Sequence, residues 1–398
     1  MRVPMLDLSE QYRSLADPIR AEIEDVLASQ RFILGPRLDA FEKKIAAYLN
    51  VPHAIGVSSG TDALLAALMA LGTGPGDALL TTDFSFFATA GCIARLGATP
   101  VFVDIDPTTY NISIAALKKF FESECQNGGK RSAFPTIKSA SGQRLRLRGI
   151  MPIHLFGLCC EIDQIKSLAE QFNIPVIEDA AQAIGAEFPG LGKGGTIGDL
   201  GCFSFYPSKN LGAAGDAGLV VCRNEDLAKT LRICRQHGME PRYEHHFIGG
   251  NFRLDELQAA ILNVKLPHLD TWSAARRAAA DVYRGEFEKA GLTTMIGLPA
   301  EPYRDRGVTN HHIYHQYVIR TPRRDELRAY LAKQEIETAI YYPLALHEQK
   351  CFQYLGYKPG DFPESERAAR ETLALPIYPE IAREAQRFVV NAIVEFFK

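Results

Sequence analysis

A lysine in a turn is the first residue of this sequence that could carry out chemistry. Lys209 follows the apolar run 201–205 and stands in a turn that contains proline and glycine, FYPSKNLG. A turn lysine is ordinarily solvated and inert. When its surroundings destabilise the ammonium, however, the neutral amine is a nucleophile that forms a Schiff base with a carbonyl group and then transfers protons. This segment alone leaves both roles open.

Two acids and an amide follow another apolar run. Val176 and Ile177 lead into Glu178 and Asp179, and Gln182 stands three residues later. Ligands of open α/β sheets gather at the carboxyl ends of strands. A carboxylate there could keep the ring nitrogen of a cofactor protonated, and the amide could bind a ring hydroxyl. The alternative is that the acids cap a following helix.

The segment SSGTD at residues 58–62 has the composition of a phosphate-binding helix start. A helix N-terminus offers unpaired N–H groups and a positive dipole, and Gly60 lets an anion approach the backbone closely. Serine, threonine and aspartate are also ordinary helix caps. The segment therefore predicts a helix start with either role.

The elements around these segments predict an α/β protein. Apolar residues recur at helical spacing over residues 11–30 and 38–49. Short apolar runs then alternate with amphipathic segments, which predicts a mostly parallel sheet with helices on its faces. Loops that follow parallel strands share one edge of the sheet. We therefore expect four loops to line a common site: residues 58–61, 82–87, 178–182 and 202–209.

A second unit is predicted after residue 262. A helical pattern runs from residue 254 to residue 289, interrupted at Pro267, as expected of a connector. A chain of 398 residues is also longer than one hydrophobic core usually supports. We expect a large domain at residues 1–262 and a smaller α+β domain at residues 263–398. In the latter, strands are predicted at 315–319 and 337–341, and helices at 323–333, 363–372 and 382–397.

Residues 126–148 depart from this pattern. They are rich in glycine, serine, lysine and arginine, which predicts an inserted loop or hairpin before a strand that begins at Gly149. Their charges are expected to face water. A basic flap over a phosphate-bearing substrate is the functional alternative.

Composition argues against several classes of partner. A net charge of −3 and a pI near 6.4 give no excess of basic residues for nucleic acid. No apolar run is long enough for a membrane span and the first residues lack a signal pattern, so the cytoplasm is the expected location. The eight cysteines form no Cys-x-x-Cys pair and the histidine pairs have no ligand companions, so we expect free thiols and no metal.

In combination, these segments resemble the DegT/DnrJ/EryC1/StrS family. The resemblance rests on SSGTDAL, EDAAQAIGA, FSFYPSKNLG, GDAG at residues 215–218 and GGNFRLDELQAAIL at residues 249–262. It extends over nearly the whole chain, from residues 7–8 to LALPIYP at residues 373–379. The family consists of fold type I pyridoxal-phosphate (PLP) enzymes, mostly sugar-nucleotide aminotransferases. The resemblance thus implies PLP as cofactor and a mostly parallel, seven-stranded sheet in the large domain.

The resemblance implies roles for single residues. Lys209 would form the Schiff base with PLP, and Asp179 would pair with the pyridinium nitrogen. The other implied contacts are Gln182 at the 3-hydroxyl, Phe86 on the ring face and, at the phosphate, Gly60, Thr61 and Ser204. Core packing is the alternative for Phe86.

An active site shared between two subunits is also implied. Asn251 stands where the family reaches the PLP phosphate of the neighbouring subunit, which implies a homodimer. Gly250 precedes it where the family commonly has a bulky residue, so we expect a looser backbone here.

Two segments favour amination at C3 of the sugar. FYPSKNLG followed by GDAG resembles the C3-aminating enzymes, whereas C4-aminating ones often carry histidine or asparagine where this chain has Tyr206. Tyr341 and Tyr342 match a segment near the sugar, although histidine is usual at the first position, and His347 fits the loop that follows. A surface position is the alternative for His347. The implied substrates are a dTDP- or UDP-linked 3-keto (deoxy)hexose and glutamate as amino donor.

The sequence gives less support to other functions. Family dehydratases lack the Schiff-base lysine, so Lys209 argues against dehydration. GLGKGG at residues 190–195 is not placed between an early strand and a helix, which argues against a dinucleotide-binding oxidoreductase. A C4 aminotransferase stays open, as does a non-catalytic PLP-binding regulatory protein, although no helix-turn-helix or basic tail supports the latter.

Overall fold

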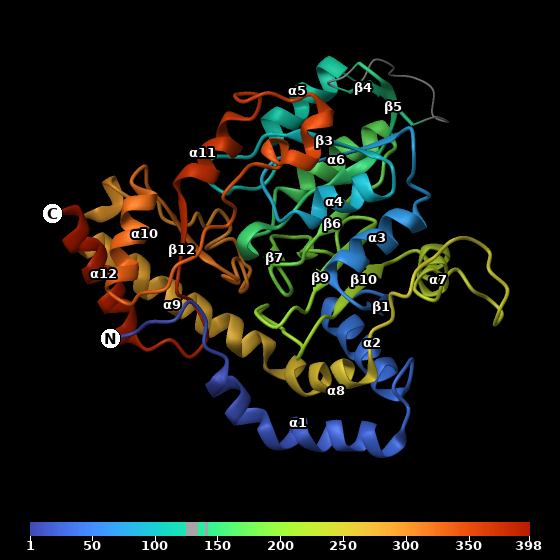
Figure 1. Cartoon of the computed structure of the whole chain (residues 1–398), viewed down its shortest axis with the longest axis horizontal. Helices are drawn as coiled ribbons and strands as arrows, with labels where there is room; N and C mark the ends of the chain where they lie inside the picture. The colour runs from blue at the N-terminus through green and yellow to red at the C-terminus, as the bar shows by residue number, and fades with distance from the viewer. Residues whose placement is uncertain (125–133, 140–141) are drawn as a thin grey trace.

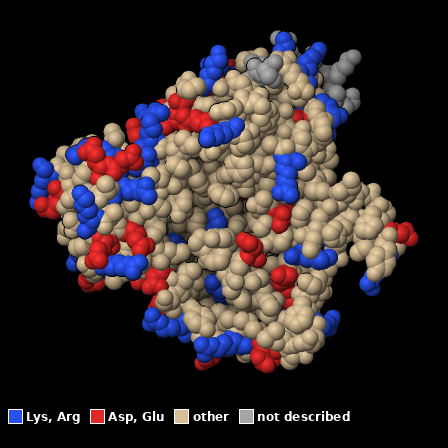
Figure 2. Space-filling model, in the orientation of Figure 1, with Lys and Arg blue, Asp and Glu red and all other residues tan. Residues whose placement is uncertain are grey.

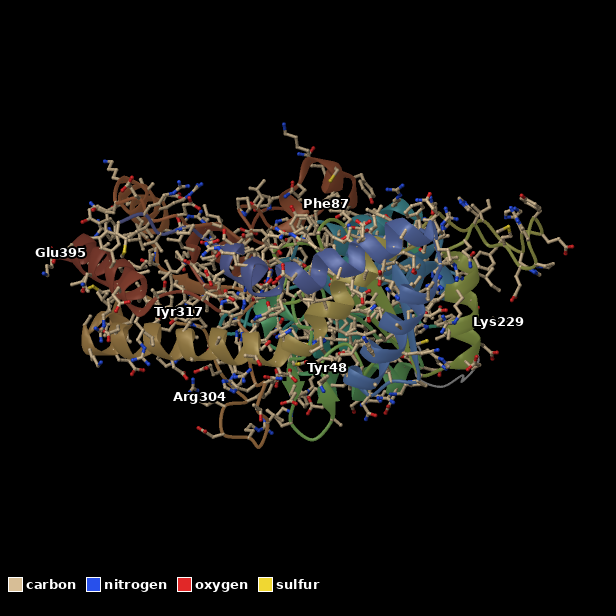
Figure 3. The ribbon with its side chains drawn as sticks, turned by 90° about the horizontal axis from the view of Figure 1, so that it is seen from below. Tyr48, Phe87, Lys229, Arg304, Tyr317 and Glu395 are labelled. Carbon is tan, nitrogen blue, oxygen red and sulfur yellow. The ribbon has the colours of Figure 1, made fainter. Side chains whose placement is uncertain are left out.

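Helices enclose a central sheet in the computed structural model of this chain, which describes residues 1–124, 134–139 and 142–398 (Figure 1). Both chain ends lie on the side of α12 (Arg383–Phe397). Figure 3 shows α12, with Glu395, at one end of the molecule and α7 (Glu225–Cys234), with Lys229, at the other. The sheet lies between these two ends.

Seven strands form the continuous sheet of the large unit, in the order β3-β2-β5-β6-β9-β10-β1. Two parallel bridges, Ile150 to Val176 and Ile153 to Asp179, join β5 to β6. Among these seven strands, β10 alone runs opposite to the direction shared by the other six, so the predicted mostly parallel sheet is confirmed. The strands are β1 (His53–Val57), β2 (Asp77–Thr82), β3 (Thr99–Val103), β5 (Arg144–Met151), β6 (Ile177–Asp179), β9 (Leu200–Ser204) and β10 (Gly218–Cys222).

Helices cover both faces of this sheet because successive strand residues point to opposite sides. Leu79 and Val220 pack in an apolar cluster with α3, α4 and α7, whereas their neighbours Leu80 and Val221 pack in another with α2, α5, α6 and α8. The first two helices each begin two residues before their predicted starts. The helices of this unit, besides α7, are α1 (Ser9–Ser29), α2 (Pro36–Leu49), α3 (Gly60–Ala70), α4 (Ala88–Arg95), α5 (Ile114–Glu124), α6 (Ile162–Phe172) and α8 (Glu256–Lys265), with the short pieces η1 (Leu155–Gly157), β7 (Glu187–Phe188) and β8 (Gly192–Lys193).

A second hydrophobic core lies around α9 (Leu269–Lys289) and includes Val3 from the start of the chain. The 3-10 turn η2 (Leu266–His268) contains Pro267 and separates α8 from α9, as predicted. The domain boundary at residue 262 stays a prediction. The remaining elements are β11 (Tyr317–Arg320), β12 (Thr372–Leu375), α10 (Arg324–Lys333), α11 (Pro363–Glu371), η3 (Leu292–Thr294), η4 (Leu346–Glu348) and η5 (Lys350–Leu355), and β11 pairs antiparallel with β12.

Two strands predicted in this second unit are placed differently. β11 begins at Tyr317, two residues late, because the preceding His-Gln pair lines a cavity instead. The strand predicted at 337–341 is wrong. The N–H of Glu337 bonds the carbonyl of Val3, whereas Ala339 exchanges bonds with Ala374. Because these two residues bond different segments, no continuous ladder forms.

The insertion predicted at residues 126–148 contains a hairpin. β4 (Thr136–Lys138) pairs antiparallel with the start of β5, which begins five residues earlier than predicted. Residues 126–133 and 140–141 of the insertion lie outside the described residues. Nε of Arg146 lies 2.8 Å from Oδ1 of Asp77, and Arg148 donates to the carbonyl of Leu71. These two arginines therefore contact Asp77 and Leu71 within the large unit, and they do not form a flap over a substrate.

A buried carboxylate joins the start of α2 to α8. Glu256 is 1 % exposed, and its oxygens accept the N–H groups of Gly35, Arg37 and Leu38 at 2.8–2.9 Å. The first N–H groups of a helix have no partners within the helix, and they lie at the positive end of its dipole. Glu256 supplies both the acceptors and the negative charge that this helix start needs.

We predict that Glu256→Gln lowers the free energy of unfolding by about 1–3 kcal/mol, because the amide NH₂ faces N–H donors that lose their acceptor. Urea denaturation of the purified variant measures the change. Glu24→Gln, on the exposed side of α1, is the matched control, with an expected change within about 0.5 kcal/mol. Equal losses in the two variants would contradict this role of Glu256.

Candidate active site

A cavity of about 530 Å³ opens at the carboxyl ends of the strands. The loops after β1, β2, β6 and β9 line it together, so the common edge predicted from the sequence is present. Residues just before β11 and the pair Tyr341 and Tyr342 complete the wall from the second unit. The cavity therefore lies where the two units meet.

Lys209 lines this cavity from the turn after β9. Its N–H bonds the carbonyl of Tyr206 at 2.8 Å, and a Cβ at Gly212 would lie 2.3 Å from the carbonyl oxygen of Pro207. The tight turn therefore requires glycine at 212. Burial lowers the pKa of Lys209 from 10.5 to about 8, while the charge of Asp179 acts in the opposite direction. A usable fraction of the amine is then neutral, and hence nucleophilic, near neutral pH.

Asp179 ends β6 and lines the same cavity. It is 5 % exposed, and burial raises the pKa of its carboxyl group. Of the four groups that oppose this shift, three contribute most. Thr89 donates its hydroxyl to Oδ2 at 2.8 Å, Ala181 donates its N–H to Oδ1 at 3.2 Å, and Lys209 contributes its positive charge. A further cation beside Asp179 would favour the carboxylate more strongly.

The neighbouring Glu178 has a structural role. Its oxygens accept the N–H groups of Gly195, Ile197 and Gly198 at 2.6–2.8 Å and lie 2.8 Å from Nε2 of His154. Burial raises the pKa of Glu178, but the bonds from His154 and the N–H groups lower it overall. The helix cap considered for this acid pair is wrong, because turns rather than a helix follow residue 179.

The start of α3 combines the two roles considered for it. Ser59 caps the helix by accepting the N–H of Asp62 at 3.0 Å, while Gly60 and Thr61 line the cavity. A Cβ at Gly60 would lie 2.7 Å from Cβ of Ser204, which also lines the cavity. Close packing therefore leaves no room for a side chain at residue 60. The backbone N–H groups of this helix start can then approach an anion in the cavity closely.

Aromatic side chains form another part of the wall. Phe86 is 58 % exposed, so core packing does not explain it, and its ring lies 6.2 Å from that of Tyr342 between centroids. Nε2 of Gln182 donates to the hydroxyl of Tyr342 at 2.8 Å. Oε1 of Gln182 is buried and has no hydrogen-bond partner within the described residues. Tyr206 and Tyr341 also line the cavity, as predicted for residues near a substrate.

His347 is not brought to the cavity. Its ring is buried, with Nδ1 2.6 Å from Oδ2 of Asp83 and Nε2 3.5 Å from Oε1 of Glu366. Both the predicted sugar contact and the alternative of a surface histidine need correction. Two acids hold the ring inside the protein instead of on the cavity wall.

Asn251 lies outside the cavity of its own chain. It is exposed, and its backbone bridges to Gln236. A contact with a neighbouring subunit stays a prediction. The looser backbone expected at Gly250 is wrong. Its N–H bonds the carbonyl of Cys234 at 3.0 Å, and a Cβ there would meet the ring of Phe252 at 2.2 Å.

Several cavity residues were missed by the sequence reasoning. His315 and Gln316 line the cavity, and burial lowers the pKa of His315 well below its ordinary value, so the ring is neutral. The sequence signal that could have identified them is that this polar pair stands at the start of an apolar run. Thr89, which bonds Asp179, gave no local signal because it belongs to a helix start that is ordinary in sequence, whereas Ser85 lies in the loop at residues 82–87 that was predicted to line the site.

The surface and the side-chain clusters limit the other possibilities. On the face shown in Figure 2, lysine and arginine are mixed with aspartate and glutamate and form no continuous basic patch. Among the described residues, no group of three or more histidine, cysteine, aspartate or glutamate side chains could hold a metal ion. In the same part of the chain, no helix is sufficiently long and apolar to span a membrane.

Fold and cavity together define a class of protein. A nucleophilic lysine, a buried carboxylate and a bare helix start surround one cavity in a two-unit α/β fold, the arrangement that a phosphate-bearing carbonyl cofactor requires. The model of the DegT/DnrJ/EryC1/StrS aminotransferase family matches residues 14–394, and the chain belongs to this family.

Individual relatives resemble the chain along its whole length. A pleiotropic regulatory protein of Geobacillus stearothermophilus is 46 % identical and aligns over 100 % of this chain and 99 % of its own. A UDP-N-acetyl-3-dehydro-α-D-glucosamine 3-aminotransferase of Acidithiobacillus ferrooxidans is 40 % identical over 96 % of this chain and 94 % of its own. The crystal structure of NtdA from Bacillus subtilis with bound cofactor PMP is 28 % identical, with a TM-score of 0.85, over 99 % of this chain and 85 % of its own.

The cavity residues fit PLP. The unpartnered Oε1 of Gln182 is an acceptor suited to a ring hydroxyl, and the bare start of α3 at Gly60 suits a phosphate. Asp179 provides a carboxylate for a protonated ring nitrogen, and Lys209 an amine for an aldehyde. Each polar group of the cofactor has a complementary group on the cavity wall.

We predict that, in cofactor-free protein, amine-directed labelling of Lys209 reaches half its maximal rate near pH 8, because only the neutral amine reacts. Asp179→Asn should move this midpoint to lower pH, since the aspartate charge raises the pKa of Lys209. Mass spectrometry of labelled peptides over a pH series measures both midpoints.

Lys265 provides the matched control for this experiment. Burial alone lowers its pKa to about 8, so its midpoint should not change in Asp179→Asn. Equal shifts of the labelling midpoint at Lys209 and Lys265 would show that Asp179→Asn alters the structure of the protein in general. No shift at Lys209 would contradict the electrostatic coupling.

Proposed function

We propose that this chain is a PLP-dependent aminotransferase that transfers an amino group from glutamate to a 3-keto sugar nucleotide. The observation that carries the proposal is that Lys209 and Asp179 face one cavity and that the start of α3 forms part of its wall. When bound, PLP supplies the carbonyl group that takes up the amino group and a ring that stabilises negative charge on the substrate carbon. PMP, present in the NtdA structure, is the aminated form of this cofactor.

The chain's own residues have separate tasks in this proposal. Lys209 attaches the cofactor through Nζ and afterwards moves a proton at the substrate carbon as general base and acid. Its pKa near 8 suits both protonation states. Asp179 keeps the ring nitrogen protonated, and Gln182 orients the ring by its hydroxyl. The helix start at Gly60 and Thr61, together with Ser204, holds the phosphate, and Phe86 covers the ring face.

Amination at C3 is supported by the cavity wall and by one relative. Tyr206 lines the cavity three residues before Lys209, where C4-aminating members often have histidine or asparagine, and Asp216 of the GDAG segment lines it too. The relative from Acidithiobacillus ferrooxidans carries a 3-aminotransferase name. Tyr341 takes the place of the usual histidine, and we propose that it contacts the sugar with Tyr206 and Tyr342.

We further propose a homodimer in which Asn251 reaches the phosphate of the partner's cofactor. Its exposure and its position outside its own cavity agree with this arrangement. Backbone bonds of Gly250 and Phe252 hold the chain on either side of Asn251.

A regulatory function is the second candidate, because the relative from Geobacillus stearothermophilus is named a regulatory protein. Such a protein could bind PLP without catalysing turnover. The lowered pKa of Lys209 suits Schiff-base attachment in either case, because attachment needs the neutral amine. The relative from Acidithiobacillus ferrooxidans, which is named an aminotransferase, favours an enzyme.

We predict that wild-type protein binds PLP covalently and turns over a sugar nucleotide with glutamate, whereas Lys209→Ala loses covalent binding and at least ~10²–10⁴-fold in rate. Absorbance of the bound cofactor and product analysis measure the two effects. Lys229→Ala, on α7 at the end of the molecule, is the control (Figure 3). Wild-type protein that binds PLP but aminates no sugar nucleotide would support the regulatory candidate instead.

The position of amination has its own test. A panel of 3-keto and 4-keto sugars, each linked to UDP and to dTDP, is supplied with glutamate, and amino-sugar formation is measured. We expect turnover of a 3-keto member and at least about tenfold lower kcat/KM for the 4-keto members. Turnover of 4-keto substrates alone would overturn the C3 assignment and leave the aminotransferase assignment intact.

A further inference from the structure

A chain of two buried hydroxyl groups ends on the cavity carboxylate. Oγ of Ser85 lies 3.0 Å from Oγ1 of Thr89, and Oγ1 of Thr89 lies 2.8 Å from Oδ2 of Asp179. Thr89 is fully buried, Ser85 is 3 % exposed and Asp179 is 5 % exposed. Water therefore contributes little to this chain, and its hydrogen bonds carry the full electrostatic effect.

The direction of these hydrogen bonds follows from the charge of Asp179. An ionised carboxylate only accepts, and a hydroxyl group has one hydrogen to donate. Thr89 must therefore donate to Asp179, and Ser85 must donate to Thr89. A hydroxyl group that donates to the carboxylate favours its ionised form, and the bond from Ser85 leaves the hydrogen of Thr89 available for Asp179.

Thr89 also ties the carboxylate to the aromatic wall of the cavity. Its N–H bonds the carbonyl of Phe86 at 3.3 Å, in the turn that begins α4. The ring of Phe86 lines the cavity, while the hydroxyl of Thr89 points to Asp179. One short turn thereby fixes both the face on which a cofactor ring rests and the acid at its edge.

We propose that Thr89, supported by Ser85, is a positioning residue that holds Asp179 ionised and aimed at the ring nitrogen of PLP. This inference rests on the proposed PLP-dependent function and adds residues to it. Both residues act through Asp179 and touch no reacting atom. The alternative donor to Asp179, the N–H of Ala181, bonds the other oxygen at a longer 3.2 Å and cannot replace Thr89.

The hydrogen bond from Thr89 has a measurable electrostatic effect. Burial raises the pKa of Asp179, and this bond is the strongest of the contributions that lower it. Removal of the hydroxyl should therefore weaken attraction for a protonated ring nitrogen specifically. Contacts to the phosphate and to the ring hydroxyl should be unaffected.

The test compares two ligands in cofactor-free protein: pyridoxamine phosphate and its 1-deaza analogue, in which a C–H replaces the ring nitrogen. Neither ligand needs the lysine for attachment. Calorimetry gives the dissociation constants for wild type, Thr89→Val and Thr89→Ser. Thr89→Val keeps the shape of the side chain but not its hydroxyl, and Thr89→Ser keeps the hydroxyl.

We expect Thr89→Val to raise the dissociation constant for pyridoxamine phosphate about tenfold or more, since a charge-assisted hydrogen bond is lost. The constant for the deaza analogue should change less than about twofold, because no ring nitrogen is present. Thr89→Ser should bind both ligands as wild type does. Equal weakening of both ligands in Thr89→Val would overturn the inference, because it would show a merely structural role.

Ser85→Ala extends the test if Thr89→Val does not fold. Loss of the hydroxyl that supports Thr89 should weaken pyridoxamine phosphate more than the deaza analogue, and equal effects on both would again overturn the inference. Wild-type protein that binds neither ligand would contradict the proposed function itself. The two failures are thereby distinguished.

Discussion

The site depends on one negative charge held where burial disfavours it. Asp179 is 5 % exposed, and a carboxylate removed from water needs hydrogen bonds and cations to replace its hydration. Thr89, Ala181 and Lys209 supply them. The same charge raises the pKa of Lys209 while burial lowers it, so the acid and the amine set each other's protonation across the cavity. The protonation state of each residue therefore depends on the presence of the other.

The order of the strands brings these two groups together. β6 and β9 are parallel neighbours, so Asp179 and the turn that carries Lys209 reach the same edge of the sheet. β10 then returns antiparallel along β9, so residues 205–217 connect the two strands without a crossover helix. The lysine turn is therefore held between two strands that pair with each other. This geometry gives the amine a defined position, which a long surface loop would not.

Local sequence was sufficient to predict that strands lead into the four site loops and that these loops share one edge of the sheet, because apolar runs, proline and glycine act locally. The bond from Thr89 to Asp179 could not be predicted, since it joins residues 90 positions apart and depends on how α4 packs. His347 shows the related limit. Its loop was recognised, but the direction of its ring is decided by two acids from distant segments, Asp83 and Glu366. The strand expected at residues 337–341 failed because its bonding partners are set by tertiary contacts.

The two units contribute different groups to the wall of the cavity. The groups suited to PLP belong to the large unit, whereas His315, Gln316, Tyr341 and Tyr342 belong to the second. A hydrogen bond of 2.8 Å from Gln182 to Tyr342 connects the two sets. Under the proposed function, a substitution at Tyr341 would alter which sugar is accepted while Lys209 and Asp179 keep their surroundings. The sugar contact proposed for Tyr206 would stay in place in such a variant, so a change of substrate would not require new reactive groups.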